Sequence, residues 1–212
     1  WPDIVTLNGS GRSVSVLLAD GKGSFLRLAD RPLAQVPAGG VLADVNGDTK
    51  LDLVVVNPDI STVSVLAGEG SDGEGVFDAP RDFATGDSPS QVVAGDLDED
   101  GAPDLVTANA HSFSVLLGLG GASFAPHRDY AVAPEAMALA DVNLDGHLDL
   151  VVSSNGLGIM LGKGDGTFSC IEEYAQSTQT SALAVGDLNG DGRPDLATTG
   201  YRGVSVLLNR PR

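Results

Sequence analysis

The stretch Asp141-Val-Asn143-Leu-Asp145-Gly-His147-Leu-Asp149 places oxygen-bearing side chains at its first, third, fifth and ninth positions. A short apolar run precedes it and another follows it. The same nine-residue motif occurs at residues 44–52, 96–104 and 187–195, and Trp1-Pro2-Asp3 aligns with its last three positions. These five copies divide the chain into consecutive repeats, so the rest of the sequence can be placed relative to them.

The repeats are similar in length and in internal pattern. The last motif aspartates, Asp3, Asp52, Asp104, Asp149 and Asp195, are separated by 49, 52, 45 and 46 residues. In each repeat a short β-branched run such as residues 53–56 follows and indicates a buried strand. The alternating stretch after it, such as residues 62–66, predicts a half-buried strand. A glycine-rich turn that ends on an aromatic residue, a more polar strand, and a strand leading into the next motif complete the unit.

Four short strands at a period of about 40–50 residues are typical of a β-propeller blade, which buries both faces only by packing against neighbouring blades. We therefore predict an all-β fold, a single β-propeller domain of four-stranded antiparallel blades. The domain covers residues 1–212, with repeats at about 1–33, 34–86, 87–132, 133–177 and 178–212.

About five blades are expected, and both terminal blades are incomplete. The first lacks the strand before its motif, and the last stops before its fourth strand. Either five blades close with these two incomplete ones, or the chain is part of a longer propeller. The position of Trp1 inside a motif favours the second interpretation.

The acidic residues are concentrated in the motifs. The chain has 29 Asp and Glu against 12 Lys and Arg, a formal net charge of -17. The four complete motifs hold three, four, three and three aspartates, which is 13 of the 29 acids. Binding to a nucleic-acid backbone requires a basic patch, so this balance argues against nucleic acid as a partner. Like charges this close repel one another, so a fold that gathers them implies a bound cation.

The remaining chemistry-bearing residues indicate little. The single cysteine, Cys170, excludes an intrachain disulfide, and we expect it to be a small hydrophobic residue on a strand. His111, His127 and His147 are scattered over loops and an outer strand, and we expect each to be exposed to solvent. No apolar run approaches the roughly 18 residues of a membrane helix, so no membrane insertion is expected.

Calcium is the cation that fits the motif. Ca²⁺ takes six to eight oxygen ligands, and carboxylates alternating along a tight loop can supply them. We expect side chains at positions one, three, five and nine to converge, and position seven to offer its backbone carbonyl. The predicted ligands are Asp44, Asn46, Asp48, Lys50 and Asp52; Asp96, Asp98, Asp100, Ala102 and Asp104; Asp141, Asn143, Asp145, His147 and Asp149; and Asp187, Asn189, Asp191, Arg193 and Asp195.

About four calcium ions follow from this prediction, and the four sites are not identical. Glycine at position six allows a sharp turn in three copies, but Thr49 stands there in the first, so we expect that loop to be strained or weaker. Asp98 makes the second loop the most anionic, and we expect it to bind calcium most tightly. An EF-hand is excluded, because it needs a Glu at position twelve and flanking helices.

The stretch from Gly186 to Leu196, followed by Val204-Ser-Val-Leu-Leu208, resembles the FG-GAP/VCBS repeat family, and the resemblance covers essentially the whole chain. It implies an integrin-α-like β-propeller, often seven-bladed, with calcium between the first two strands of a blade. Such propellers are usually extracellular and serve adhesion, protein binding or sugar binding. Some fungal lectins and some polysaccharide lyases use similar calcium-loop blades.

We expect a secreted or surface-attached, non-enzymatic binding or adhesion module with a protein or glycan ligand and structural calcium. Carboxylates committed to calcium are poor general acids or bases, and the glycine-rich turns join two strands, so no helix N-terminus is available for a phosphate. The alternatives are the propeller portion of a polysaccharide lyase or hydrolase, and a scaffold between other domains. Other domains or missing blades of the same protein are further possible partners.

Overall fold

The computed structural model of the 212-residue chain describes residues 1–69, 76–154, 156–174, 180–200 and 203–210. In this part of the chain the regular structure is β-strand, apart from one 3-10 turn at Pro58–Ile60. Among these residues no helix has the length and apolar character that crossing a membrane requires. The all-β fold class predicted from the repeats is therefore confirmed.

Three antiparallel sheets are complete four-stranded blades, here called blades 2, 3 and 4. Blade 2 consists of β5 (Gly39–Ala43), β6 (Asp52–Asn57), β7 (Thr62–Leu66) and β10 (Arg81–Ala84). Blade 3 consists of β11 (Gln91–Gly95), β12 (Asp104–Ala108), β13 (Phe113–Leu116) and β14 (Arg128–Tyr130). Blade 4 consists of β15 (Ala136–Ala140), β16 (Asp149–Ser153), β17 (Leu157–Met160) and β18 (Glu172–Tyr174). A two-stranded ribbon, β8 (Gly68–Glu69) with β9 (Val76–Phe77), extends blade 2.

The two terminal sheets are incomplete blades. Blade 1 contains β1 (Ile4–Asn8), β2 (Ser13–Ala19), β3 (Phe25–Arg27) and β4 (Arg31–Pro32), and both β3 and β4 pair with β2. Blade 5 contains β19 (Thr180–Gly186), β20 (Asp195–Gly200) and β21 (Gly203–Leu207). In the described residues, blade 1 has no strand before its motif position and blade 5 has no fourth strand, as the strand count predicts.

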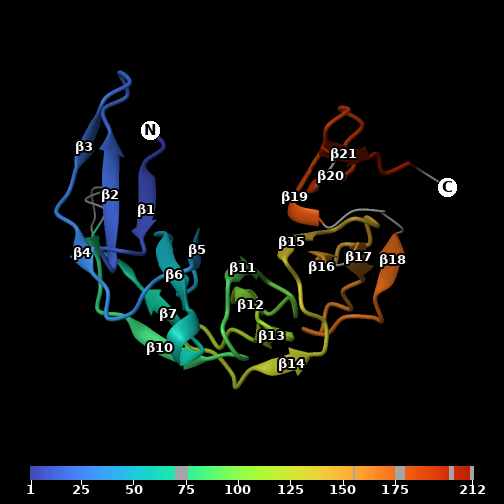
Figure 1. Ribbon diagram of the computed structural model, residues 1–212, viewed down its shortest axis with the longest axis horizontal. Helices are drawn as coiled ribbons and strands as arrows, with labels where there is room; N and C mark the ends of the chain where they lie inside the picture. The colour runs from blue at the N-terminus through green and yellow to red at the C-terminus, as the bar shows by residue number, and fades with distance from the viewer. Residues whose placement is uncertain (70–75, 155, 175–179, 201–202, 211–212) are drawn as a thin grey trace.

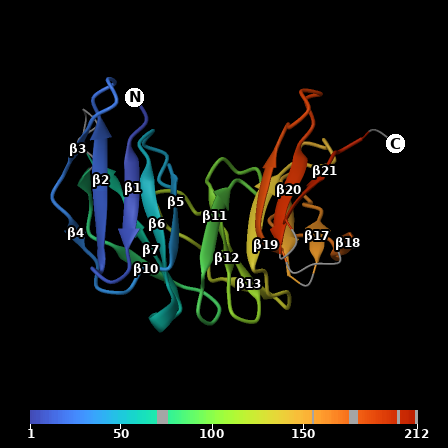
Figure 2. The same ribbon diagram turned by 45° about the horizontal axis from the view of Figure 1, so that its top comes forward.

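The five blades lie side by side along an open arc, with blade 1 at one end and blade 5 at the other (Figures 1 and 2). A closed five-bladed ring is therefore not the arrangement in this structure. The first strands of neighbouring blades contact one another, β5 with β11, β11 with β15, and β15 with β19. Small residues allow this close approach, since a Cβ atom added to Gly39 would lie 2.8 Å from the carbonyl oxygen of Ser90.

The hydrophobic cores lie between adjacent blades. Valines of β6 and β7 pack against Val92, Leu105 and Leu116 of blade 3, and a second cluster joins blades 3 and 4. Similar clusters join blade 1 to blade 2 and blade 4 to blade 5. The middle strands β6, β12 and β16 are buried along their whole length, because each is covered by a neighbouring blade on both faces.

The half-burial predicted for the third strands is wrong, because neighbouring blades cover them. The alternating strands β7 and β13 were expected to be half-buried, but Ser64 and Ser114 lie inside and make hydrogen bonds there. His127 and His147 are only partly exposed, each beside a carboxylate, whereas His111 is exposed as predicted.

The prediction for Cys170 is also wrong. Its side chain is exposed and lies outside any strand. The residue belongs to the segment that connects the short bridge at Phe168 to the outer strand β18, where no neighbouring blade covers it.

Candidate metal centres and an interblade cleft

Each nine-residue motif forms the connection between the first and second strands of a blade. Loop 1 (residues 44–52) joins β5 to β6, loop 2 (96–104) joins β11 to β12, loop 3 (141–149) joins β15 to β16, and loop 4 (187–195) joins β19 to β20. In every case the ninth-position aspartate is already the first residue of the second strand. The loops are therefore held at equivalent places in blades 2 to 5.

The ninth-position aspartates, Asp52, Asp104, Asp149 and Asp195, are fully buried. In each, Oδ2 accepts the backbone N–H of the second loop residue at 2.7–3.0 Å. Oδ1 accepts a backbone N–H just beyond the third strand at 2.6–2.8 Å. Asp3 accepts the Ala19 N–H at 2.7 Å in the same way. The ninth-position aspartate of each loop, itself the first residue of the second strand, therefore links the loop to the end of the third strand even without a metal.

The burial of these carboxylates has an electrostatic cost. Burial, together with the charges of Asp98 and Asp96, raises the pKa of Asp104 to about 6, although hydrogen bonds from the Gly118 and Leu97 N–H groups oppose the shift. Burial likewise raises the pKa values of the ninth-position aspartates in loops 1 and 3. A cation at the loop would favour the ionised form and reverse this shift.

Positions four and six of every loop adopt the left-handed backbone conformation. At position six the φ values are 70° for Thr49 and 79–96° for the three glycines. The strain predicted for the first loop is thus present, because a β-branched residue disfavours this region. Position four is also left-handed and was missed by the sequence analysis, since Glu99 (φ 61°) and Leu144 (φ 62°) are not typical turn residues.

Loop 2 brings three carboxylates together. Ligand oxygens of Asp96, Asp98 and Asp104 lie within 4.8 Å of one another. Oδ1 of Asp96 and Oδ1 of Asp98 are buried and have no hydrogen-bond partner. Buried carboxylate oxygens without a partner are costly, and a cation bound between them would satisfy both. The residues of loop 2 therefore fit the calcium ion that the motif implies, and Asp96, Asp98 and Asp104 would hold it.

The other predicted ligands are arranged differently. The fifth-position aspartates (Asp48, Asp100, Asp145 and Asp191) each accept the backbone N–H of position seven (Lys50, Ala102, His147 and Arg193) at 2.8–2.9 Å. The first-position aspartates of loops 1, 3 and 4 (Asp44, Asp141 and Asp187) accept backbone N–H groups from positions four to six. The third-position asparagines (Asn46, Asn143 and Asn189) accept the N–H of position five. Among the described residues, three clustered acidic groups of metal-binding geometry occur in loop 2 alone.

One interblade contact connects two loops directly. Nδ1 of His147 in loop 3 lies 2.5 Å from a carboxylate oxygen of Glu99 in loop 2. This hydrogen bond raises the pKa of His147 above its usual value. The contact places the fourth position of one loop against the seventh position of the next.

A polar network that recurs within each of blades 1, 2 and 3 was missed by the sequence analysis. An asparagine five residues after the ninth-position aspartate donates to a serine in the third strand, and this serine donates to an aspartate at or near the outer strand. The networks are Asn8–Ser15–Asp30, Asn57–Ser64–Asp82 and Asn109–Ser114–Asp129, with distances of 2.5–2.8 Å. The asparagine at a constant five residues after the ninth-position aspartate is the signal that could have pointed to the network, whereas the spacing to the serine and the outer aspartate varies between blades.

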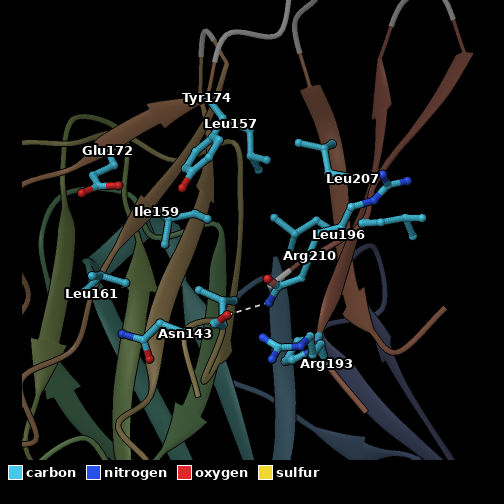
Figure 3. A pocket seen from close by; sticks show the side chains of 14 residues that line it. Asn143, Leu157, Ile159, Leu161, Glu172, Tyr174, Arg193, Leu196, Leu207 and Arg210 are labelled. Carbon is cyan, nitrogen blue, oxygen red and sulfur yellow. Dashed lines mark hydrogen bonds between the residues drawn. The ribbon is translucent and has the colours of Figure 1, made fainter. Parts of the chain in front are cut away.

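A cleft of about 620 Å³ lies between blades 4 and 5. Its apolar walls come from Leu157, Ile159, Leu161, Leu196 and Leu207. Glu172, Tyr174, Arg193 and Arg210 add polar groups around this apolar lining (Figure 3). At one side the amide of Asn209 donates to the Val142 carbonyl at 2.6 Å and so joins the two blades. The sequence did not indicate this cleft, because it depends on how two blades are angled against each other.

Blades of four antiparallel strands, with an aspartate loop between the first two, define a repeat protein of the β-propeller class. A family model described as FG-GAP-like repeat matches residues 44–107, 96–152 and 141–198. The chain belongs to this FG-GAP repeat family. No curated protein matches the sequence.

Solved structures share the fold at low sequence identity. An Agrocybe aegerita lectin described as recognising non-reducing terminal N-acetylglucosamine matches with a TM-score of 0.65 and 18% identity, over 98% of this chain and 63% of the lectin. The V. cholerae biofilm matrix protein Bap1 matches with a TM-score of 0.53 and 18% identity, over 92% of this chain and 30% of Bap1. BBS1N, in complex with ARL6DN, matches with a TM-score of 0.58 and 12% identity, over 96% of this chain and 72% of BBS1N. The chain thus spans less than two thirds of the lectin and of Bap1.

Proposed function

We propose that this chain is a non-enzymatic carbohydrate-binding module of an extracellular or surface-attached protein, stabilised by calcium in its aspartate loops. The cleft between blades 4 and 5 carries this proposal. Small-molecule sites are concave, mostly apolar, and contain a few polar groups that fix the orientation of the ligand. The cleft combines leucine and isoleucine walls with Tyr174, Arg193, Arg210 and Glu172. An aromatic ring and charged hydrogen-bonding groups suit the apolar faces and hydroxyl groups of a sugar.

Two further observations support the proposal. The lectin among the structural neighbours recognises a terminal sugar, and Bap1 is a matrix protein of a biofilm. Loop 2 contains two buried carboxylate oxygens without hydrogen-bond partners, Oδ1 of Asp96 and Oδ1 of Asp98. Extracellular calcium, near millimolar, is sufficient for weak modular sites. Calcium in this proposal is structural: it holds the first two strands of a blade together and takes no part in ligand chemistry.

A glycan array probed with the purified chain in calcium tests the proposal. The bound glycan should lose about tenfold in affinity or more with Arg210→Ala, because a hydrogen bond to a charged group is worth roughly 1.5–3 kcal/mol. Arg12→Ala is the matched control, since Arg12 is an exposed arginine of blade 1, far from the cleft. An array without bound glycans, or equal affinities for the two variants, would contradict the assignment.

Structural calcium has a separate test. Thermal melting in calcium and in EDTA should show a higher midpoint with calcium, because an ion bound only by the folded state stabilises it by mass action. Equal midpoints at millimolar calcium would contradict the structural role.

A further inference from the structure

The third position distinguishes loop 2 from the other three loops. Loops 1, 3 and 4 have an asparagine there, and loop 2 has Asp98. An amide side chain both accepts and donates hydrogen bonds, whereas an ionised carboxylate only accepts them. An asparagine at this position can therefore donate a hydrogen bond to a carboxylate of its own loop, which an ionised aspartate cannot do.

This hydrogen bond is present in all three asparagine loops. Each Nδ2 donates to a carboxylate of its own loop, Asn46 to Asp52 at 3.3 Å, Asn143 to Asp145 at 2.8 Å and Asn189 to Asp191 at 3.1 Å. The first-position aspartates of the same loops each accept two or three backbone N–H groups. In these loops the carboxylates are therefore hydrogen-bonded by donors of the same loop.

Loop 2 has no asparagine amide, and its first-position aspartate accepts fewer backbone N–H groups than those of the other loops. Asp96 accepts one backbone N–H, from Gly101 at 3.0 Å, and its Oδ1 is buried without a partner, as is Oδ1 of Asp98. Asp104 completes the cluster within 4.8 Å. None of the salt bridges in the described part of the chain involves these three residues. Buried charges without counterparts are strongly unfavourable, so a cation gains most in this loop.

We propose that the four loops do not share calcium equally: Asp96, Asp98 and Asp104 form one tight site, and loops 1, 3 and 4 bind calcium weakly. This inference rests on the proposed role of calcium and assigns it mainly to blade 3. In the weak loops calcium must first displace the asparagine amide from its carboxylate partner, whereas loop 2 has no such bond to break. Affinity at oxygen sites also rises with the number of charged ligands, which favours loop 2.

Calcium titration of the chelator-treated chain by isothermal calorimetry tests the inference. One ion should bind at least about tenfold more tightly than the rest. Asp98→Asn should remove the tight class, because it gives loop 2 the asparagine of its neighbours. Asn143→Asp should create a second tight site in loop 3, which has glycine at position six, as loop 2 does. Glu99→Gln is the matched control: it removes one charge from loop 2 at a side chain that contacts His147, and it should leave the tight class intact.

The outcomes separate this inference from the proposed function. Four equivalent sites in the unchanged chain, or an Asn143→Asp variant with one tight site, would overturn the inference and leave structural calcium standing. Loss of the tight class in Glu99→Gln to the same extent as in Asp98→Asn would also overturn it, since net charge would then be the cause. Absence of any calcium binding at millimolar concentration would overturn both this inference and the structural role of calcium. Circular dichroism in EDTA confirms that each variant is folded before it is titrated.

Discussion

Asp104→Ala tests whether the buried ninth-position aspartate supports the blade without metal. The substitution leaves the N–H groups of Leu97 and Gly118, now bound at 2.7 and 2.6 Å, without an acceptor. Each buried unsatisfied group costs about 1–3 kcal/mol, which gives roughly 2–6 kcal/mol for the pair. The desolvation that raises the Asp104 pKa offsets part of this loss, so we expect a decrease of about 2–4 kcal/mol in the free energy of unfolding.

The assay is thermal or urea unfolding in EDTA, where calcium cannot contribute. For a chain of this size 1 kcal/mol corresponds to about 2–4 °C, so the melting temperature should fall by about 4–16 °C. Asp3→Ala is the matched control, because Asp3 makes one equivalent bond to Ala19 at an exposed site, and it should cost less than about 1 kcal/mol. Equal, small effects of the two substitutions would show that the buried carboxylate acts only through a metal and would refute the reasoning.

Three other substitutions test the packing, the backbone and the charge network. Leu105→Ala removes a fully buried side chain between blades 2 and 3 and should cost about 2–5 kcal/mol in urea unfolding, whereas Leu119→Ala, at an exposed site, should change stability by less than about 0.5 kcal/mol. Thr49→Gly should raise the melting temperature in EDTA by about 1–4 °C, because glycine relieves the left-handed strain at φ 70°; a decrease would show that the loop does not store this strain. Hydrogen bonds from Ser15 and Arg27 lower the pKa of Asp30, so its contribution is present above its unfolded pKa of about 4 and is lost as pH falls through the lower folded value. The difference in urea midpoint between the unchanged chain and Asp30→Asn should therefore be constant above about pH 5 and shrink below pH 4; a difference independent of pH would contradict this.

The fold was predictable because the same motif and the same strand pattern occur in successive repeats along the chain. The aspartate motifs place the loops, and β-branched runs such as Leu53–Val56 place the second strands that become fully buried. Both incomplete blades followed from counting strands against these markers. The sequence patterns of a blade do not state how many blades close a ring, so they left open both a closed five-bladed ring and part of a longer propeller; the structure has an open arc and not the closed five-bladed ring.

Exposure was predicted less well, because period-two patterns do not reveal a second covering layer. Ser64 alternates with valines and therefore indicates a solvent-facing side, yet it is buried and bonded to Asn57 and Asp82. The left-handed backbone at Glu99 and Leu144 was hidden for a related reason. The loop imposes this conformation through its hydrogen bonds to the carboxylates, not through the local preference of the residue.

The convergence of metal ligands was predictable in type but not in distribution. Sequence spacing alone treats positions one, three, five and nine as equivalent in all loops. In the structure, the fifth-position aspartates bind the N–H of position seven, and three acidic groups converge in loop 2. Loops 1, 3 and 4 also differ from loop 2 at position three, where the amide of Asn46, Asn143 or Asn189 donates to a carboxylate of its own loop and Asp98 has no such donor.

Departures from the repeat are more informative about function than the repeat itself. Blades 1, 2 and 3 share the asparagine–serine–aspartate network, but in blade 4 Gly158 stands where the serine would be, and Ile171 fills the space beside it. The same strand, β17, turns Leu157 and Ile159 toward the cleft. A strand without the polar network can carry apolar residues on both faces, one packed against blade 3 and one facing the cleft. The loss of the network in blade 4 thus coincides with the apolar wall on which the proposed ligand site depends.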